Sequence, residues 1–240
     1  MLIGTLVTLS CPSVAEILAD VGFDWLFIDS EHGALNASEI QSILQAAQNK
    51  CPCIVRVPSD DEVFIKKALD VGASGIIVPM VNSAESAQRI VELAKFPPEG
   101  RRGVGVARAH GYGMKFVEYM ETANDEIAVI IQVEHIDAVN NIESIVKVSG
   151  VDGVIVGPYD LSGSIGKPGQ VMDDEVQKHI KKVFDVCSAS GMPLGIFGIN
   201  AEMAQPFIEQ GFSLIAVGID TLYLATSAEA TLGKLRKSIV

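Results

Sequence analysis

Residues 127–160 read IAVIIQVEHIDAVNNIESIVKVSGVDGVIVGPYD, and this stretch decides the fold class. It begins with Ile127–Val133, a short run of apolar and β-branched residues that is typical of a buried strand. In the following segment, Asp137–Val148, apolar residues recur three and four positions apart, which indicates a helix. A second strand-like run, Gly153–Val156, comes next. A strand, a helix and a strand in this order predict a βαβ unit with parallel strands.

The same alternation extends from this stretch in both directions along the chain. Eight short apolar runs are predicted as strands: Leu2–Leu9, Trp25–Asp29, Cys53–Val57, Gly75–Val81, Ile127–Val133, Gly153–Val156, Pro193–Phe197 and Leu214–Gly218. Eight strands joined by helical crossovers favour a single closed (β/α)8 TIM barrel of the α/β class. A flavodoxin-like open sheet of about six strands is the alternative.

Helical patterns separate most of these runs. They cover Ser38–Lys50, Asp60–Val71, Ser83–Lys95, Asp137–Val148 and Asp173–Ala189. Several begin with Ser or Asp, which cap helix N-termini, and end at a glycine, which terminates helices. The longest irregular stretch, Phe96 to Met114, contains Pro97, Pro98 and five glycines. We expect it to be an active-site loop rather than a domain boundary.

Length and composition favour one globular domain over residues 1–240. Hydrophobic residues make up 48% and charged residues 20% of the chain, which is enough apolar material for one large core. The formal net charge of -12 disfavours nucleic acid or an anionic membrane as a partner. Four cysteines without a C-x-x-C motif indicate reduced thiols. Because no leader-like or membrane-spanning segment is evident, we expect a cytoplasmic protein.

Polar residues gather at the carboxyl ends of the predicted strands, which is the end of a barrel that carries function. His32 closes a polar segment after the second strand, and Arg56 lies within the apolar third strand. A guanidinium in such a run needs an anionic partner or a substrate carboxylate. Alternation along the fifth strand places Gln132 and Glu134 on one face, which we expect to be the barrel interior. The residues alone therefore predict a barrel enzyme for a small anionic substrate.

Two carboxylates on neighbouring strands provide a candidate metal site. Glu134 follows the fifth strand, and Asp160 follows the sixth in a turn whose glycine lets the backbone approach a small ligand. They could share one divalent cation, and oxygen ligands favour magnesium, manganese or cobalt over zinc. Taken alone, Asp160 could equally cap the next helix. His110 and His135 are expected to be structural.

Taken together, these motifs resemble the HpcH/HpaI family of class II, metal-dependent 2-oxo acid aldolases. The resemblance is carried by GFDWLFIDSEH (22–32), VRVP (55–58), GIIVPMV (75–81), GRRGVG (100–105), QVE (132–134) and VDGVIVGPYDLS (151–162). It runs from about Leu2 to the last helix. The ordered set is highly specific, although each part alone would be weak.

The resemblance implies roles for the matching residues. It implies that Glu134 and Asp160 bind the divalent metal ion. His32 is implied to assist proton transfer. Arg56 is implied to hold the oxo acid and the charge that develops on it during the reaction.

Two further residues receive a substrate-binding role from the resemblance. Gln132 is implied to touch the substrate, and Tyr159 to offer its backbone N–H to the substrate carboxylate. The family commonly has Ala or Ser where this chain has Tyr159. A phenol at this place either narrows the pocket or points away from it.

The implied reaction is reversible aldol cleavage of a 4-hydroxy-2-oxo acid to pyruvate and an aldehyde. A divalent cation bound by the carboxylate and carbonyl oxygens of pyruvate polarises the carbonyl and stabilises the enolate. Arg56 adds positive charge, and His32 moves the proton directly or through metal-bound water. The rival aldolase chemistry uses a lysine Schiff base, and none of the predicted strands contains a lysine.

Two other functions stay open at this point. An oxaloacetate-type decarboxylase would form the same enolate with carbon dioxide as the leaving group. A catalytically silent barrel could serve as a binding subunit, but it would be expected to lack at least one of the four residues His32, Arg56, Glu134 and Asp160, which are all present.

The position of Asp70 leads to a prediction about whether copies of the chain associate. The resemblance implies that it pairs with the catalytic histidine, yet Asp70 lies near the end of the predicted helix Asp60–Val71, at the opposite end of the barrel from His32. A helix of three turns spans roughly 15 Å, so the pairing would have to reach His32 of a neighbouring subunit. A carboxylate at a helix C-terminus is unfavourable without a compensating donor, which favours this pairing over a solvated helix end. We therefore expect a homo-oligomer, such as a hexamer.

Overall fold

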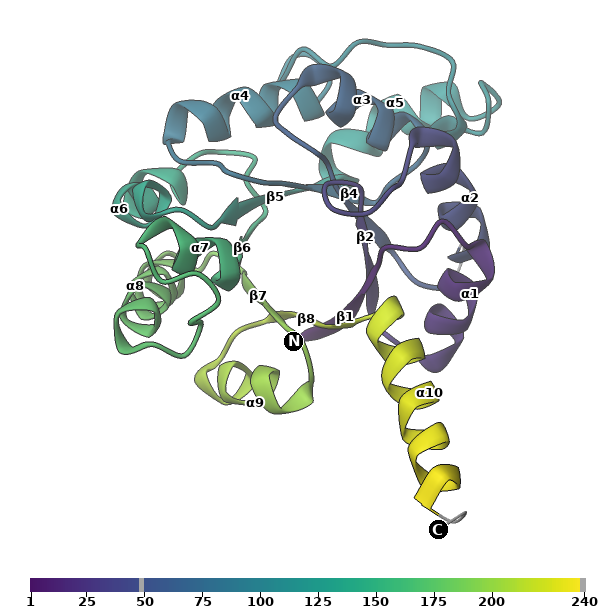
Figure 1. The fold of residues 1–240 in the computed structure, drawn as a ribbon. Coiled ribbons are helices and arrows are strands. Elements are labelled where there is room, and N and C mark those ends of the chain that lie inside the picture. The colour runs from purple at the N-terminus through teal and green to yellow at the C-terminus, as the bar shows by residue number, and fades with distance from the viewer. Residues whose placement is uncertain (48–49, 238–240) are drawn as a thin grey trace.

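The computed structural model describes residues 1–47 and 50–237, and eight parallel strands in this part of the chain close into a barrel (Figure 1). The strands are β1 (Leu2–Val7), β2 (Trp25–Asp29), β3 (Cys53–Arg56), β4 (Gly75–Val78), β5 (Ala128–Val133), β6 (Gly153–Val156), β7 (Leu194–Gly198) and β8 (Leu214–Ile219). Each strand pairs with the next in chain order, and β8 pairs with β1. The predicted TIM barrel is confirmed, and the open-sheet alternative is wrong.

All eight predicted strands are present, with differences at their ends. β1, β3 and β4 stop two, one and three residues before the ends of the apolar runs. Pro79 follows β4 directly, and a proline has no N–H to donate to a neighbouring strand. Val57 and Val81 nevertheless stay buried beyond the strands. Apolar runs in the sequence therefore predict which side chains are buried better than they predict where the hydrogen bonding of a strand ends.

Ten α-helices lie in the described part of the chain. They are α1 (Pro12–Val21), α2 (Ala37–Ala47), α3 (Glu62–Asp70), α4 (Ala84–Ala94), α5 (Phe116–Glu126), α6 (Ile136–Ile145), α7 (Pro158–Ser164), α8 (Asp174–Ser190), α9 (Ala201–Gln210) and α10 (Asp220–Lys237). The side chains of Asp61, Ser83 and Asp173 accept hydrogen bonds from backbone amides in the first turns of α3, α4 and α8. Residues 48 and 49 of the helix predicted at Ser38–Lys50 lie outside the described residues.

Apolar side chains form two layers of core. One layer lies between strands and helices, and the other fills the barrel interior with Leu6, Trp25, Phe27, Ile54, Ile77, Ile130, Ile155 and Ala216. Trp25 fits inside because residue 4 is glycine: a Cβ there would lie 2.4 Å from the indole ring. The interior is thus occupied by side chains, as in other barrels of this type, and polar chemistry is left to the strand ends.

The two ends of the described chain meet where β8 pairs with β1. At the start of α10, the buried Asp220 carboxylate accepts hydrogen bonds from the backbone N–H groups of Thr8 and Leu9, both at 2.9 Å. The Thr8 hydroxyl donates to the same carboxylate at 2.7 Å. These bonds compensate the burial of the charge and hold the segment after β1 against the end of β8.

The last helix is arranged differently from the others, because α10 projects away from the barrel (Figure 1). Asp220 is its only buried residue among those described, and Leu224, Leu232 and Leu235 are exposed. An exposed row of leucines on a helix is typical of a surface that contacts protein. No helix in the described residues is both long enough and apolar enough to cross a membrane.

Candidate active site

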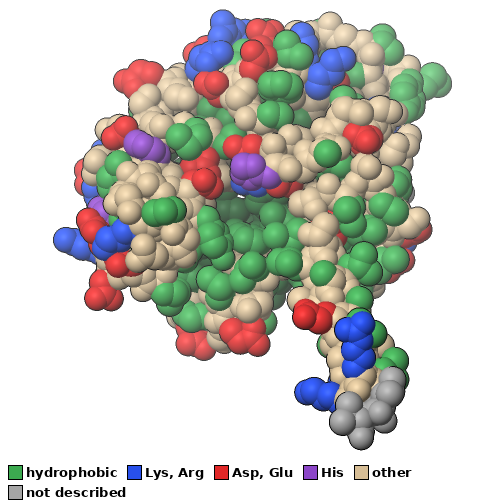
Figure 2. Space-filling model, viewed as in Figure 1, with side chains coloured by type: hydrophobic (Ala, Val, Ile, Leu, Met, Phe, Trp, Pro, Cys, Tyr) green, Lys and Arg blue, Asp and Glu red, His purple; other side chains and the backbone are tan. Residues whose placement is uncertain are grey.

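A hollow at the carboxyl end of the barrel, which we call the mouth, contains the polar residues predicted from the strand ends (Figure 2). Its cavity of about 390 Å³ is lined by Asp29, Arg56 and Gln132 at the ends of β2, β3 and β5. The loop after β2 adds His32, and the first turn of α7 adds Asp160. A concave site of this size suits a small molecule.

Arg56 ends β3 with its side chain directed into the mouth, where carboxylates compensate its charge. Its Nε and Nη2 atoms donate to the two carboxylate oxygens of Asp29 at 3.0 and 2.8 Å. Nε also lies 3.2 Å from Oε2 of Glu31, and Nη1 lies 3.5 Å from Oε1 of Gln132. Burial lowers the pKa of Arg56, but the hydrogen bonds and negative charge of Asp29 outweigh it and raise the pKa overall. The guanidinium therefore stays charged and fixed in direction.

The segment after β2 is folded around the Asp29 carboxylate. Oδ1 of Asp29 accepts from the backbone N–H groups of Glu31 and His32 at 3.1 and 3.3 Å. This turn directs Glu31 toward Arg56, and burial raises the pKa of the Glu31 carboxyl against the opposing charge of Arg56. The His32 side chain is 67% exposed, and its Nε2 lies 4.0 Å from Glu31 Oε2. His32 therefore stands between the cavity and solvent.

Gln132 lines the mouth cavity and Glu134 lies beside it on the same face, as strand alternation predicts. The Gln132 amide donates to Glu134 Oε2, and Glu134 Oε1 accepts from the backbone N–H of Met80 at 2.7 Å. Burial raises the pKa of Glu134; these two hydrogen bonds oppose the shift, and the negative charge of Asp160 adds to it. The carboxylate is thus held in one orientation beside a second carboxylate.

The turn after β6 approaches Glu134 closely. A Cβ at Gly157 would lie 2.8 Å from Glu134 Oε2, so this position needs glycine. Gly157 is also the N-cap of α7, which places Asp160 inside the first turn and overturns the helix-cap alternative for that residue. The Tyr159 ring lies 6.4 Å from the ring of Phe197 at the edge of the cavity. The phenol thus lines the cavity rather than pointing away from it.

Comparison with protein families decides which family the chain is from. The HpcH/HpaI aldolase/citrate lyase family matches residues 2–227. The chain belongs to the HpcH/HpaI family.

Relatives of this HpcH/HpaI protein include named aldolases. The chain is 41% identical over 231 residues to a 4-hydroxy-2-oxo-heptane-1,7-dioate aldolase of Escherichia coli, spanning 95% of this chain and 88% of that protein. It is 39% identical over 218 residues to a 4-hydroxy-2-oxovalerate aldolase of Rhodococcus jostii, spanning 90% and 84%. A crystal structure of an HpcH/HpaI aldolase/citrate lyase family protein from Burkholderia cenocepacia matches with a TM-score of 0.95 at 35% identity, over 98% and 94%. The predicted family is confirmed.

Two residues of this HpcH/HpaI site received no role from the sequence. Asp29 and Glu31 are the anionic partners of Arg56. The position of Arg56 in an apolar strand predicted that such a partner was needed, but it did not identify the residues. Asp29 could have been found from its position at the end of the second predicted strand. The second and third strands are parallel neighbours, and their register places Asp29 opposite Arg56. Glu31 follows the strand and offers no such register.

Asp70 lies apart from the mouth, at the end of α3. Its Oδ1 is 2.9 Å from Nη2 of Arg102, whose side chain is only 1% exposed and lies 4.5 Å over the ring of Phe96. Arg102 of the same chain therefore provides a donor that compensates the Asp70 carboxylate at the helix end. Pairing of Asp70 with His32 of a neighbouring copy stays a prediction.

The loop Phe96–Met114 lies at the amino end of the barrel, which we call the floor. Arg102 pairs with Asp70 there, and Nη1 of Arg108 donates to the Val71 carbonyl oxygen at 2.7 Å, just ahead of β4. The loop therefore lies at the opposite end of its barrel from the mouth, and the expectation that it borders the active site of the same barrel is wrong. The physical reason is the chain direction, since a segment between a helix and the next strand lies at the amino ends of the strands.

Two histidines are structural, as expected. His110 is buried in this loop and hydrogen-bonds the backbone of Gly105, Ala107 and Gly113. His135 is the N-cap of α6, where Nδ1 accepts from the next turn. Neither side chain lines the mouth cavity.

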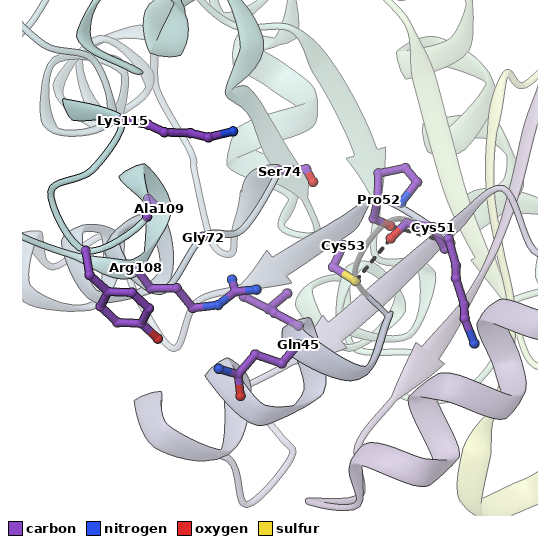
Figure 3. Close-up of a pocket in the computed structure, with 13 residues that line it drawn as sticks. Gln45, Cys51, Pro52, Cys53, Gly72, Ser74, Arg108, Ala109 and Lys115 are labelled. Carbon is purple, nitrogen blue, oxygen red and sulfur yellow. Dashed lines mark hydrogen bonds between the residues drawn. The ribbon is translucent and has the colours of Figure 1, made fainter. Parts of the chain in front are cut away.

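A larger cavity of about 670 Å³ lies at the floor, and its chemistry differs (Figure 3). Figure 3 shows Arg108 and Lys115 on one side and Cys51 and Cys53 at the start of β3 on the other. Burial raises the pKa of Cys51 to about 11 and of Cys53 to about 12, so both thiols stay protonated near neutral pH. No Asp or Glu of the described residues lines this cavity. Among the described residues, the floor cavity therefore lacks the carboxylates that line the mouth cavity.

Proposed function

We propose that the chain catalyses reversible aldol cleavage of a 4-hydroxy-2-oxo acid to pyruvate and an aldehyde. The C4 hydroxyl loses its proton, the C3–C4 bond breaks, and the electron pair is shared between C3 and the C2 oxygen until C3 takes up a proton. The observation that carries the proposal is Arg56, a charged guanidinium held by Asp29 and Glu31 on the wall of a cavity. The names of the relatives, both aldolases for 4-hydroxy-2-oxo acids, support this reaction class.

The proposal includes a divalent cation, magnesium, manganese or cobalt, held by Glu134 and Asp160. Asp29, Glu31 and Glu134 surround the single guanidinium of Arg56, and Asp160 adds negative charge beside Glu134. This excess of negative charge suits a bound cation. Carboxylate oxygens are the ligands that such ions prefer. No group of three or more His, Cys, Asp or Glu in the described chain is arranged to hold a metal, so water and substrate oxygens would complete the shell. Bound there, the ion supplies a Lewis acid for the C2 carbonyl.

The remaining roles follow from where each group lies. Arg56 orients the 2-oxo acid and offsets the negative charge that develops on the C2 oxygen. Gln132 keeps Glu134 in place through its amide and borders the substrate. Tyr159 offers a backbone N–H at the N-terminal turn of α7, where carboxylates are favoured. His32, at the border with solvent, carries the proton of the C4 hydroxyl away from the site.

Replacement of Glu134 tests the metal site. We expect Glu134→Gln to abolish metal-stimulated release of pyruvate from 4-hydroxy-2-oxo acids, because an amide is a much poorer ligand than a carboxylate. The wild-type protein should lose activity in EDTA and regain it with manganese. Glu118→Gln on the exposed side of α5 is the matched control and should behave as wild type. Full activity of Glu134→Gln without added metal would contradict the proposal, and faster pyruvate release from oxaloacetate would favour the decarboxylase.

We propose in addition that the chain forms a homo-oligomer, with Asp70 of one copy near His32 of another. The exposed leucines of α10 support association, and the Asp70 side chain remains 32% exposed beside Arg102. Mixing inactive His32→Ala with inactive Asp70→Asn subunits should restore a fraction of the activity, because some mixed interfaces regain one intact pair. Each variant alone is the control. A fully active monomer in sedimentation experiments would refute the proposal.

A further inference from the structure

We infer that the acceptor side of the mouth is built for a neutral aliphatic aldehyde and not for one that carries a second carboxylate. The inference rests on the proposed aldol function and specifies its substrate class. The relatives differ on this point by name, since a heptane-1,7-dioate ends in a carboxylate and an oxovalerate ends in a methyl group. The walls of the cavity favour the second kind of substrate.

The cavity has two unlike halves. The charged and amide side chains of Asp29, Arg56, Gln132 and Asp160 come from β2, β3, β5 and α7, whereas the residues that β1, β7 and β8 contribute to the lining, Leu6, Phe197 and Ile219, are apolar. Figure 2 shows the same division, with charged side chains along one side of the hollow and hydrophobic side chains along the other. If the 2-oxo acid lies against Arg56 on the polar side, the group beyond C4 extends over the apolar side.

The apolar half offers no cation to a distal carboxylate. Among the residues that line the cavity, Arg56 and His32 are the only basic ones. Arg56 is already engaged with Asp29 and Glu31 and would bind the 2-oxo acid. A second carboxylate would lose water against Phe197 and Ile219 without gaining an ionic partner, and the surrounding acidic groups would repel it.

The neutral polar groups on this side do not change the balance. The hydroxyl of Thr8 donates to Asp220 at 2.7 Å, so it is already in use. Thr221 adds a hydroxyl without charge. The Tyr159 ring, packed near Phe197, extends the apolar wall to the rim. An alkyl chain can therefore be buried continuously from C4 outward.

The volume limits the length of that alkyl chain. At roughly 30 Å³ per water-sized group, about 390 Å³ holds roughly a dozen non-hydrogen atoms. Pyruvate takes about half of that space. Short and medium aldehydes should therefore fit, and each methylene buried against the wall should raise kcat/KM roughly two- to fourfold until the cavity is full.

Two aldehydes of equal length test the inference in the condensation direction with pyruvate and manganese. Butanal and 4-oxobutanoate both have four carbons and differ in the terminal group. We expect kcat/KM for butanal to exceed that for 4-oxobutanoate by at least about tenfold. Equal values, or a preference for 4-oxobutanoate, would overturn the inference. Exchange of the pyruvate methyl protons with deuterium, followed by NMR without any aldehyde, tests the aldol function separately, because it reports proton removal from C3 alone.

A charge placed on the wall should reverse the preference. Phe197→Arg should lower the butanal to 4-oxobutanoate ratio by about tenfold or more, because the guanidinium supplies the missing partner. Ile17→Arg, on the exposed side of α1, adds the same charge elsewhere and should keep the wild-type ratio. If Phe197→Arg does not fold, Tyr159→Arg at the exposed rim serves in its place. A folded variant that retains deuterium exchange with an unchanged ratio would show that the wall does not contact the acceptor.

Discussion

Arg56 at the mouth and Arg102 at the floor are two buried arginines in similar local surroundings. Each pairs with one aspartate, at 2.8 and 2.9 Å. Each also lies over an aromatic ring, Arg56 at 5.2 Å from the Phe27 centroid and Arg102 at 4.5 Å from that of Phe96. By burial, ion pairing and aromatic contact alone, either could belong to an active site.

The difference lies in what else surrounds each guanidinium. Arg56 borders a cavity and has a second carboxylate, Glu31, and the amide of Gln132 within reach. Arg102 is enclosed by Phe96 and Tyr119 and borders neither of the two cavities described above. A buried charge pair is therefore a poor sign of function, whereas a fixed cation that faces open space among surplus carboxylates is a good one.

The largest expected difference between the two arginines is in turnover. Arg56→Lys replaces a planar fork with a point charge, so we expect kcat to fall by about 10²-fold or more, as for loss of an oxyanion donor. Steady-state kinetics of pyruvate release measure it, with the midpoint of urea unfolding as the control for folding. Near-normal turnover would make Arg56 a structural residue like Arg102.

The same substitution at the floor should act on stability instead. Arg102→Lys loses the hydrogen bond to the Tyr119 hydroxyl and the flat contact with Phe96, so we expect the free energy of unfolding to drop by about 1–3 kcal/mol. The kcat of the folded variant should stay within about twofold of wild type. A large fall in kcat at unchanged stability would instead show that Arg102 positions Asp70 for the pairing with His32 of another copy that we propose.

The smallest expected effect concerns the four thiols, two of which, Cys51 and Cys53, line the floor cavity. Burial raises the pKa of Cys51 to about 11 and of Cys53 and Cys187 to about 12, so these thiols carry almost no thiolate at pH 8. Cys11 is exposed. A chromogenic disulfide reagent should therefore modify one thiol per native chain at pH 8 and four after unfolding in urea. Rapid labelling of Cys51 would show that the floor cavity is a reactive site after all.

The sequence predicted the parts of the mouth that depend on local periodicity. Alternation along β5 is enough to place Gln132 and Glu134 on one face, and an arginine in an apolar strand is enough to require an acidic partner. The order of strands follows from the repeated strand and helix pattern, because parallel neighbours joined by helices pair in sequence. These features need no knowledge of distant contacts.

Other features depend on contacts that no local pattern specifies. The pairing of Asp70 with Arg102 joins two segments 32 positions apart at the floor. The apolar half of the mouth exists only once Ile219 of β8 lies beside Leu6 of β1. The loop 96–114 has the composition of a functional loop, and only the direction of the chain assigns it to the floor. Composition therefore identifies flexible or glycine-rich segments without showing which end they occupy.

The Asp220 carboxylate, which joins the segment after β1 to the end of β8, has a consequence for how the protein folds during synthesis. Its hydrogen bonds to Thr8 and Leu9 span 212 and 211 positions, so they form only after nearly the whole chain has been made. Until then β1 and the latest strand present open edges, which can pair with other chains. Barrel closure is thus a late, non-local step. A nascent chain that stops before Asp220 lacks the carboxylate that joins its two ends, and it should depend on chaperones or aggregate.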